Sequence, residues 1–135
     1  VFLDAQEMKY VEELGGMNMY FVYADGSIVT PATGTILEGI TRSSIIQIAR
    51  DLGHEVTERR FGIDEWRSGV ASGEIVEIFA CGTAAVVSPV GELRSAEGNT
   101  PAPSSTELTM KIRSALVDVK FGRAADTHGW LRKVL

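Results

Sequence analysis

The segment from Leu37 to Arg42 combines the residue types that hold a phosphate group. Gly39 leads directly into the expected start of a helix, where Thr41 adds a hydroxyl. Free N–H groups and the positive end of the dipole at a helix start favour a bound anion. Glycine followed by threonine also begins many ordinary helices, so simple capping without a ligand is the alternative.

Two further segments contain a candidate anion site and a pair of carboxylates. Cys81–Ala84 holds a glycine between two apolar runs, where successive N–H groups can face an anion. A plain β-bulge gives the same pattern. Glu12 and Glu13 precede Gly15–Gly16, and a charge pair beside a glycine turn is typical of a solvated surface. A carboxylate that pointed inward would need a cationic partner, because an unpaired buried charge is costly.

The sequence lacks the residues of other common sites. His54 and His128 are its two histidines, and each is interpreted as a surface or packing residue. No cysteine or histidine cluster has metal-ligand spacing, so no metal site is predicted. Cys81 lies in an apolar run without a basic neighbour, and we expect an inert buried thiol. Neither a Rossmann nor a P-loop glycine pattern is present.

The composition indicates one soluble domain spanning residues 1–135. The chain is 44% hydrophobic and 23% charged. Its 13 basic and 18 acidic residues give a net charge of −5, which argues against a nucleic-acid surface or an anionic-membrane binder. No window is long and apolar enough to span a bilayer, and no signal-peptide pattern opens the chain. One cysteine without a partner indicates a reducing, cytoplasmic setting.

The first half of the chain should place two of these segments on a hairpin and a helix. Apolar runs on either side of Asp25–Gly26 predict a hairpin over 16–31. A loop over 33–39 then leads to a helix that Thr41 caps and Gly53 ends. The strand-forming residues Val1–Leu3 look like the interior of a strand, so we expect a piece of a longer protein.

The second half alternates irregularly between strands and helices. We expect strands over 54–61, 74–79 and 84–89, a short return strand at Leu93 and a loop over 96–105. Helices are predicted over 64–72, capped by Asp64, and from Thr106 to Gly122. Trp130 indicates that the tail packs on the domain. The pattern predicts an α/β or α+β fold with a mixed, mostly antiparallel sheet.

Together, the segments resemble a known enzyme family. Glu12–Met19, Leu37–Arg42 and Gly82–Val90 are similar, in order and spacing, to the second half of branched-chain amino-acid aminotransferases. The ending Lys120–Arg123 followed by Gly129–Trp130 also resembles that family. These are fold-type IV enzymes that use pyridoxal 5'-phosphate, and the similarity covers nearly the whole chain. It implies a largely antiparallel or barrel-like sheet packed with helices, as in the large domain of those enzymes.

The resemblance assigns three residues to the cofactor ring. Glu13 matches the carboxylate that pairs with the pyridine nitrogen and keeps the ring protonated. Leu37 matches the residue packed on one ring face, and Gly16 matches the small residue on the other. A larger side chain at Gly16 would crowd the ring.

The resemblance assigns the remaining site residues to two anions. Gly39, Ile40 and Thr41 match the helix start that holds the cofactor phosphate, and Thr83 matches a further phosphate contact. The N–H groups of Thr83 and Ala84 match those that bind the substrate α-carboxylate. The implied reaction moves the amino group of valine, leucine or isoleucine to 2-oxoglutarate, in branched-chain amino-acid biosynthesis. The family also implies a cytoplasmic homodimer.

The sequence departs from the family at the lysine that forms the Schiff base. That lysine lies a few tens of residues before the glutamate, whereas Glu13 has only twelve residues ahead of it. Lys9 is too close, and Lys111, Lys120 and Lys133 lie beyond the motifs. We therefore expect a C-terminal, cofactor-cradling domain whose N-terminal small domain and catalytic lysine are absent from this chain. Alone, it should not transaminate.

Two other departures and alternatives concern the same segments. Ala85 and Ser88 stand where mammalian mitochondrial relatives have a thiol pair, so redox switching through that pair is not expected. A D-amino-acid aminotransferase or an aminodeoxychorismate lyase shares the fold, although Gly82–Val90 and the ending favour the branched-chain enzyme. A non-catalytic module that binds an anion or a partner protein is the alternative from another class.

Overall fold

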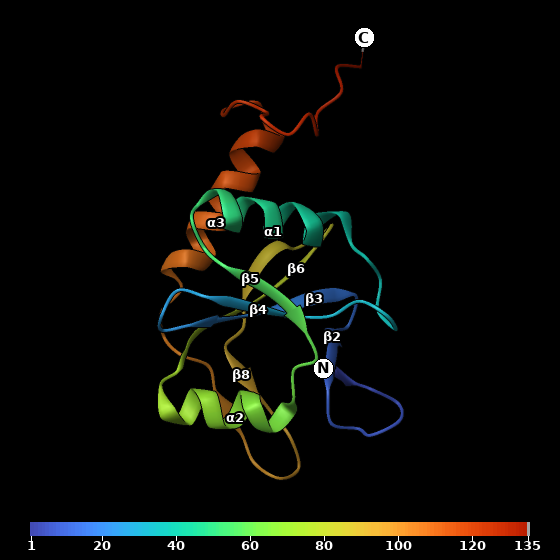
Figure 1. Cartoon of the computed structure of the whole chain (residues 1–135), viewed down its shortest axis with the longest axis vertical. Helices are drawn as coiled ribbons and strands as arrows, with labels where there is room; N and C mark the ends of the chain where they lie inside the picture. Colours follow the sequence, from blue (N-terminus) through green and yellow to red (C-terminus); the bar gives the residue numbers. More distant parts are fainter. Residues whose placement is uncertain (135) are drawn as a thin grey trace.

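The computed structural model describes residues 1–134 and contains three helices and nine strands within them (Figure 1). The strands are β1 Phe2–Leu3, β2 Val11–Leu14, β3 Met17–Tyr23, β4 Ile28–Pro31, β5 Val56–Arg59, β6 Ile75–Gly82, β7 Val86–Pro89, β8 Glu92–Leu93 and β9 Thr100–Pro101. The helices are α1 Ile40–Asp51, α2 Ile63–Ser72 and α3 Glu107–Lys120.

Strand β3 is the centre of a seven-stranded sheet. It pairs with β2 and β4, and along its length it also pairs with β6, which in turn pairs with β7. β1 extends the sheet beyond β2, and β5 pairs with β4 in parallel. The other pairings within residues 1–134 are antiparallel, and β8 pairs with β9 in a separate ladder. The predicted mixed, mostly antiparallel α/β fold is confirmed.

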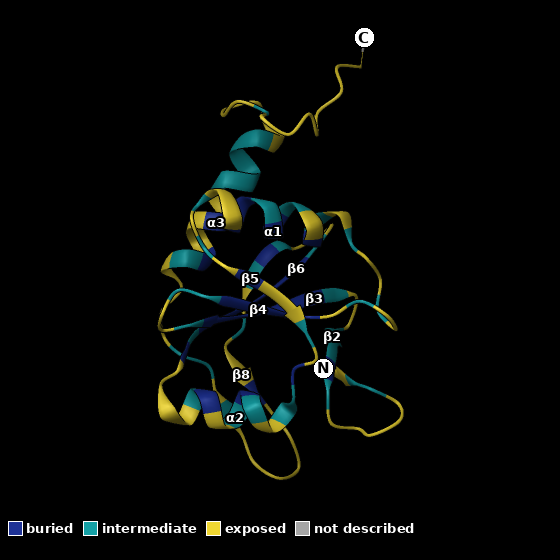
Figure 2. Cartoon of the chain, viewed as in Figure 1, coloured by how far each residue is buried: buried dark blue, intermediate teal, exposed yellow. Residues whose placement is uncertain are grey.

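Helices cover both faces of this sheet. Figure 1 shows α1 and α3 on one side, with α2 and β8 on the other. Each side has its own buried cluster, and the buried residues in Figure 2 follow the sheet between the helices. The α1 side packs Ile45, Ile48 and Ile112 on the sheet, while Trp66 of α2 packs edge-on to Phe21 on the other side.

The sequence pattern located most of these elements. Gly26, with φ of 85°, closes the predicted hairpin between β3 and β4, where Tyr23 donates its N–H to the Ser27 carbonyl over 2.9 Å. Gly53 and Gly122 follow α1 and α3 with positive φ, as expected. Trp130 stacks on His128 in the tail, with ring centroids 4.6 Å apart.

Three local predictions were wrong. α1 begins at Ile40 with Gly39 as its N-cap, so Thr41 lies inside the first turn instead of capping it. α2 has Gly62 as its N-cap, and Asp64 lies in its first turn. The bend expected at Gly82 lies one residue later, because β6 continues through Gly82 and pairs with Val86 of β7. Cross-strand pairing on both edges of β6 therefore outweighs the local preference of glycine for a turn.

A buried carboxylate from the sheet caps α3. Thr106 is the N-cap residue by position, but it makes no side-chain capping bond within the described chain. Glu77 of β6, which is 4% exposed, accepts from the N–H groups of Leu108 at 3.0 Å and Thr109 at 2.8 Å. The Thr109 and Ser105 hydroxyls donate to the same carboxylate. Burial alone would raise the pKa of Glu77, but these bonds lower it below its ordinary 4.5.

Replacing this carboxylate should loosen α3 in a pH-dependent way. We expect Glu77→Gln to lower the free energy of unfolding of the chain by about 2 kcal/mol at neutral pH, because a buried charged acceptor is lost. The folded-state pKa is depressed, so the contribution of Glu77 is fully present above pH 4.5 and is lost as the pH falls through the folded value. Urea denaturation from pH 3 to pH 7 measures this. Exposed Glu74→Gln is the matched control, and a loss of equal size there, or one independent of pH, would contradict the account.

Candidate functional site

One cleft collects the residues that the sequence had assigned to a cofactor. Its volume is about 180 Å³, and it lies between the turn after β2, the loop before α1 and the turn after β6. Its lining consists of Glu13, Gly16, Asn18, Leu37, Gly39, Ile40, Thr41, Gly82 and Thr83. All seven predicted cofactor residues are in this set. Segments up to 70 positions apart in the sequence therefore meet in one place.

The start of α1 forms one wall of the cleft. Gly39, the N-cap residue, has extended backbone geometry, and no residue of the described chain places a side-chain bond on this helix end. The first helical bond runs from the Ser43 N–H to the Gly39 carbonyl over 3.0 Å. The N–H groups of Ile40 and Thr41 lie before it, where a helix has no internal acceptors. The first turn also carries no acidic residue. This helix end suits a bound anion.

Glu13 forms part of the wall formed by β2. It is half-buried and lies opposite Asn18 in the β2–β3 ladder. Its neighbour Glu12 instead accepts a hydrogen bond from the Thr35 hydroxyl and does not line the cleft. Glu13 takes part in none of the ion pairs found within residues 1–134. The cleft therefore has a carboxylate on one wall and free backbone donors on another.

The turn between β6 and β7 closes the cleft on a third side. Gly82 and Thr83 line it, and a Cβ on Gly82 would come within 3.1 Å of Met17 Cγ. Ala84 is exposed in the same turn but does not line the cleft. Val86 leaves the turn with φ of 60°, a conformation that β-branched residues rarely adopt.

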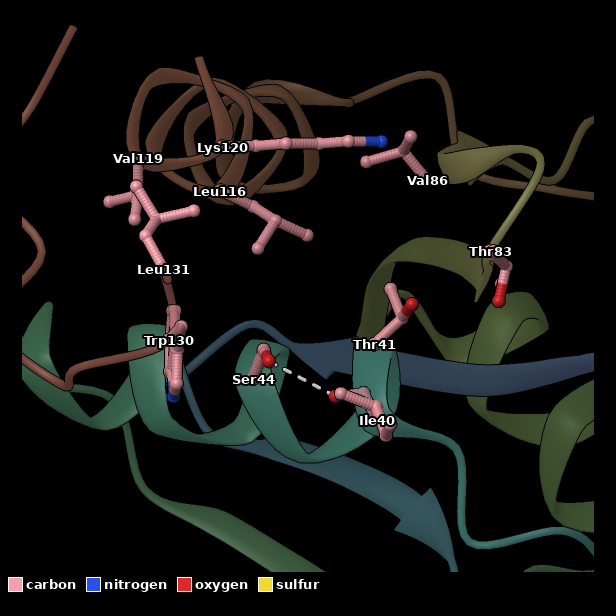
Figure 3. A pocket seen from close by; sticks show the side chains of 11 residues that line it. Ile40, Thr41, Ser44, Thr83, Val86, Leu116, Val119, Lys120, Trp130 and Leu131 are labelled. Atoms are coloured by element: carbon pink, nitrogen blue, oxygen red, sulfur yellow. Dashed lines mark hydrogen bonds between the residues drawn. The ribbon is translucent and has the colours of Figure 1, made fainter. Parts of the chain in front are cut away.

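A neighbouring hollow shares part of this lining. It measures about 210 Å³ and lies between α1, α3 and the tail (Figure 3). Thr41 and Thr83 belong to both cavities, whereas Leu116 and Trp130 belong only to this one. In Figure 3, Lys120 extends from α3 toward Val86. Most of the wall is apolar, so the hydroxyls of Thr41 and Thr83 are placed between an apolar hollow and the cleft.

Sequence reasoning missed two buried polar residues that support the cleft. Asn18 is 7% exposed, and its Nδ2 donates to the Leu37 carbonyl over 3.3 Å. Arg42, in the first turn of α1, is 5% exposed and donates to the Pro31 carbonyl at 3.0 Å and to Glu58 at 2.8 Å. Both stand in the quoted motifs, and their polarity amid apolar runs was the available signal.

Arg42 anchors the helix start to the sheet from behind. Its side chain ties α1 to the ends of β4 and β5, through Pro31 and Glu58. Its backbone carbonyl accepts from the Tyr20 hydroxyl of β3 over 2.9 Å. Burial raises the pKa of Tyr20, so this hydroxyl stays protonated and keeps donating. Three strands therefore fix the position of the α1 N–H groups.

The residues set aside as non-catalytic lie outside the cleft. Cys81 is fully buried, and burial raises the pKa of its thiol to about 12, which confirms an inert thiol. His54 Nδ1 lies 2.8 Å from the Gly26 carbonyl, and His128 Nε2 lies 2.6 Å from Asp51 in an ion-pair geometry. Both histidines are packing or surface residues, as predicted. Lys9 lies over the Tyr10 ring, and no lysine is among the cleft-lining residues.

Known proteins share this sequence and arrangement. Residues 1–93 match the family model described as amino-transferase class IV. The chain belongs to the class IV aminotransferases. A probable branched-chain-amino-acid aminotransferase of Streptomyces coelicolor is 50% identical over 133 residues, which are 96% of this chain and 36% of that protein. The branched-chain-amino-acid aminotransferase of Mycolicibacterium smegmatis is 45% identical over 140 residues, with 99% and 38% covered.

A solved class IV aminotransferase structure has the same fold. The branched-chain amino acid aminotransferase of T.th., solved with pyridoxamine 5'-phosphate, superposes with a TM-score of 0.83 and 34% identity, covering 100% of this chain and 41% of that one. This aminotransferase chain thus spans well under half the length of these relatives. Within residues 1–134, no helix is long and apolar enough to cross a membrane, and no group of three potential metal ligands occurs.

Gly39 should be required at the helix start of this aminotransferase chain. A Cβ there would lie 2.8 Å from Asn18 Oδ1, so Gly39→Ala must displace the amide or the helix start. We expect a loss of about 2 kcal/mol in the free energy of unfolding. Gly34→Ala, whose Cβ would meet no described atom within 4 Å, should change it by less than about 0.5 kcal/mol. Thermal unfolding compares the two, and equal effects would show that the Asn18–Gly39 contact is unimportant.

Proposed function

We propose that this chain is the cofactor-binding part of a pyridoxal-phosphate-dependent aminotransferase. The observation that carries the proposal is the cleft itself, in which Glu13 and the uncapped start of α1 line one cavity. The relatives named above are branched-chain-amino-acid aminotransferases, and one was solved with pyridoxamine 5'-phosphate. The proposed reaction moves the amino group of valine, leucine or isoleucine to 2-oxoglutarate and yields a branched 2-oxo acid and glutamate.

The residues of the cleft fit such a cofactor. Free N–H groups at Ile40 and Thr41 suit a phosphate dianion, and the Thr83 hydroxyl borders the same cavity. Glu13, which has no cationic partner in the described chain, suits a protonated pyridine nitrogen. Gly16 leaves room beside it, since a Cβ there would meet no atom of residues 1–134 within 4 Å. Leu37, 77% exposed, supplies an apolar surface at the cleft.

Each cleft residue then has a defined task in the reaction. Bound pyridoxal phosphate supplies an electron sink for the loss of a proton from the substrate α-carbon. Glu13 holds a proton on the pyridine nitrogen by keeping a negative charge beside it. The N–H groups of Ile40 and Thr41 bind the phosphate and so fix the orientation of the ring. Leu37 and Gly16 sandwich the ring between a bulky apolar side chain and a bare backbone.

The β6–β7 turn is proposed to bind the substrate carboxylate. Thr83 and Ala84 are both exposed in this turn, so their N–H groups are accessible beside the cleft. We infer that they hold the α-carboxylate, which orients the α-hydrogen with respect to the ring. Ala84 does not line the cleft, so its contact would be made by a substrate that extends out of it.

The remaining groups must come from outside this sequence. No cleft-lining residue is a lysine, and the relatives are much longer than this chain. We propose that an N-terminal domain supplies the lysine that transfers the proton and that the isolated chain is inactive. A homodimeric assembly in the cytoplasm, serving branched-chain amino-acid biosynthesis, completes the proposal.

Glu13 should be required for binding the cofactor ring. We expect Glu13→Gln to weaken binding of pyridoxamine 5'-phosphate by about tenfold, because the charged partner of the ring nitrogen is lost. Pyridoxamine 5'-phosphate is the probe because it has no aldehyde to react with surface lysines. Isothermal titration calorimetry measures the affinity. Glu12→Gln, next in sequence but outside the cleft, should leave it unchanged, and a larger loss at Glu12 would contradict the proposed function.

Gly16 should be dispensable for folding but not for cofactor binding. Gly16→Ala adds a methyl group with no described neighbour within 4 Å, so thermal stability should be unaffected. The same methyl group would crowd the ring, and we expect about tenfold weaker binding of pyridoxamine 5'-phosphate. Gly91→Ala, equally unhindered and outside the cleft, is the control. Unchanged affinity in Gly16→Ala would place the ring elsewhere.

The substrate class is tested on the longest natural polypeptide that contains this sequence. It should transaminate leucine, isoleucine and valine with 2-oxoglutarate, as measured by glutamate formation. Strong turnover of D-alanine without turnover of leucine would instead indicate a D-amino-acid aminotransferase.

A further inference from the structure

Asn18 occupies the point where three walls of the cleft meet. In β3 it pairs with Glu13 of β2 on one side and with Cys81 of β6 on the other, one residue before Gly82. Its side chain reaches the third wall, because Nδ2 donates to the Leu37 carbonyl over 3.3 Å. No other residue that lines the cleft has backbone partners in two of its walls and a side-chain bond to the third within the described chain.

The Asn18 amide fits closely against the loop before α1. Its Oδ1 lies only 2.8 Å from the position that a Cβ of Gly39 would occupy. Gly39 has φ of −65° and ψ of 135°, which any residue adopts, so its lack of a side chain is required by this contact and not by the backbone. The amide therefore touches both ends of the Leu37–Gly39 loop, donating to its first residue and packing on its last.

We propose that Asn18 is a positioning residue that sets the distance between Glu13 and the phosphate-binding start of α1. This inference rests on the proposed function, and it assigns Asn18 a role in addition to the contacts of the seven cofactor residues. A rigid ligand with an anion at one end and a ring nitrogen at the other binds well only when both partners are held at the matching separation. A buried side chain that bonds to one partner's loop and pairs in register with the other can hold that separation.

The phosphate contribution to binding measures this role. It is the ratio of the dissociation constants of pyridoxamine, which lacks the phosphate, and pyridoxamine 5'-phosphate. In the wild-type protein we expect the phosphate ester to bind about 100-fold more tightly, because several charge-assisted bonds are made at the helix start. Asn18→Ala should reduce the ratio by about tenfold, since the helix start is no longer held at the right distance. Calorimetric titrations use the longest natural polypeptide that contains this sequence.

A matched control separates positioning from stability. Thr30 of β4 is fully buried, and its hydroxyl donates to the Met19 carbonyl over 2.8 Å, so it is also a buried side-chain bond to backbone. It does not line the cleft. Thr30→Val should lower stability but leave the phosphate ratio at its wild-type value. If Asn18→Ala does not fold, Asn18→Ser, which is polar but too short to reach the Leu37 carbonyl, replaces it with the same expected loss.

A double substitution tests the contact with Gly39 directly. With the amide removed, a Cβ at position 39 no longer meets Oδ1, so Gly39→Ala should cost stability in the wild-type background and almost none in Asn18→Ala. An unchanged phosphate ratio in Asn18→Ala, or an equal fall in Thr30→Val, would overturn the positioning role. Equal affinity of the wild-type protein for the two probes would instead contradict the proposed function.

Discussion

The structure depends on an uncapped helix start that faces a carboxylate. A helix leaves its first N–H groups without internal acceptors, and these groups need a partner or solvent. At α1 no side chain of residues 1–134 caps the helix, although the N-cap position is filled by Gly39. At α3 the same need is met by Glu77, from inside the protein. The contrast shows that this fold caps a helix with a carboxylate where it can, and leaves α1 open toward the cleft.

The packing around α1 keeps this open end in place. Arg42 is buried behind the helix start, where a positive charge is unfavourable for the helix dipole, and it is stabilised by Glu58 and the Pro31 carbonyl. Tyr20 bonds to the carbonyl of the same residue from the central strand. Because β3 also pairs with the strand of Glu13, the central strand connects both functional walls. The core and the site are therefore parts of one hydrogen-bonded framework.

The sequence allowed the family, the element order and the cleft residues to be predicted, but not the polar framework behind them. Gly26 and Gly53 marked the turn and the helix end because positive φ is a local property of the chain. The true caps were missed because they are tertiary: Glu77 lies 31 residues before Leu108, whose N–H it accepts. Asn18 was quoted in a motif without a role, since its partner is 19 residues away and only the folded structure brings them together. The β6 extension through Gly82 likewise depended on pairing with a distant strand.

The central claim is that Glu13 and the start of α1 bind opposite ends of one molecule, and nuclear magnetic resonance of the ¹⁵N-labelled protein tests it most directly. On titration with pyridoxamine 5'-phosphate, the amide signals of Ile40, Thr41 and Thr83 should shift most, together with that of Glu13. With pyridoxamine, which lacks the phosphate, the Glu13 signal should still shift while those of Ile40 and Thr41 stay in place. Shifts confined to other parts of the protein, or amides at the helix start that do not respond to the phosphate ester, would contradict the account.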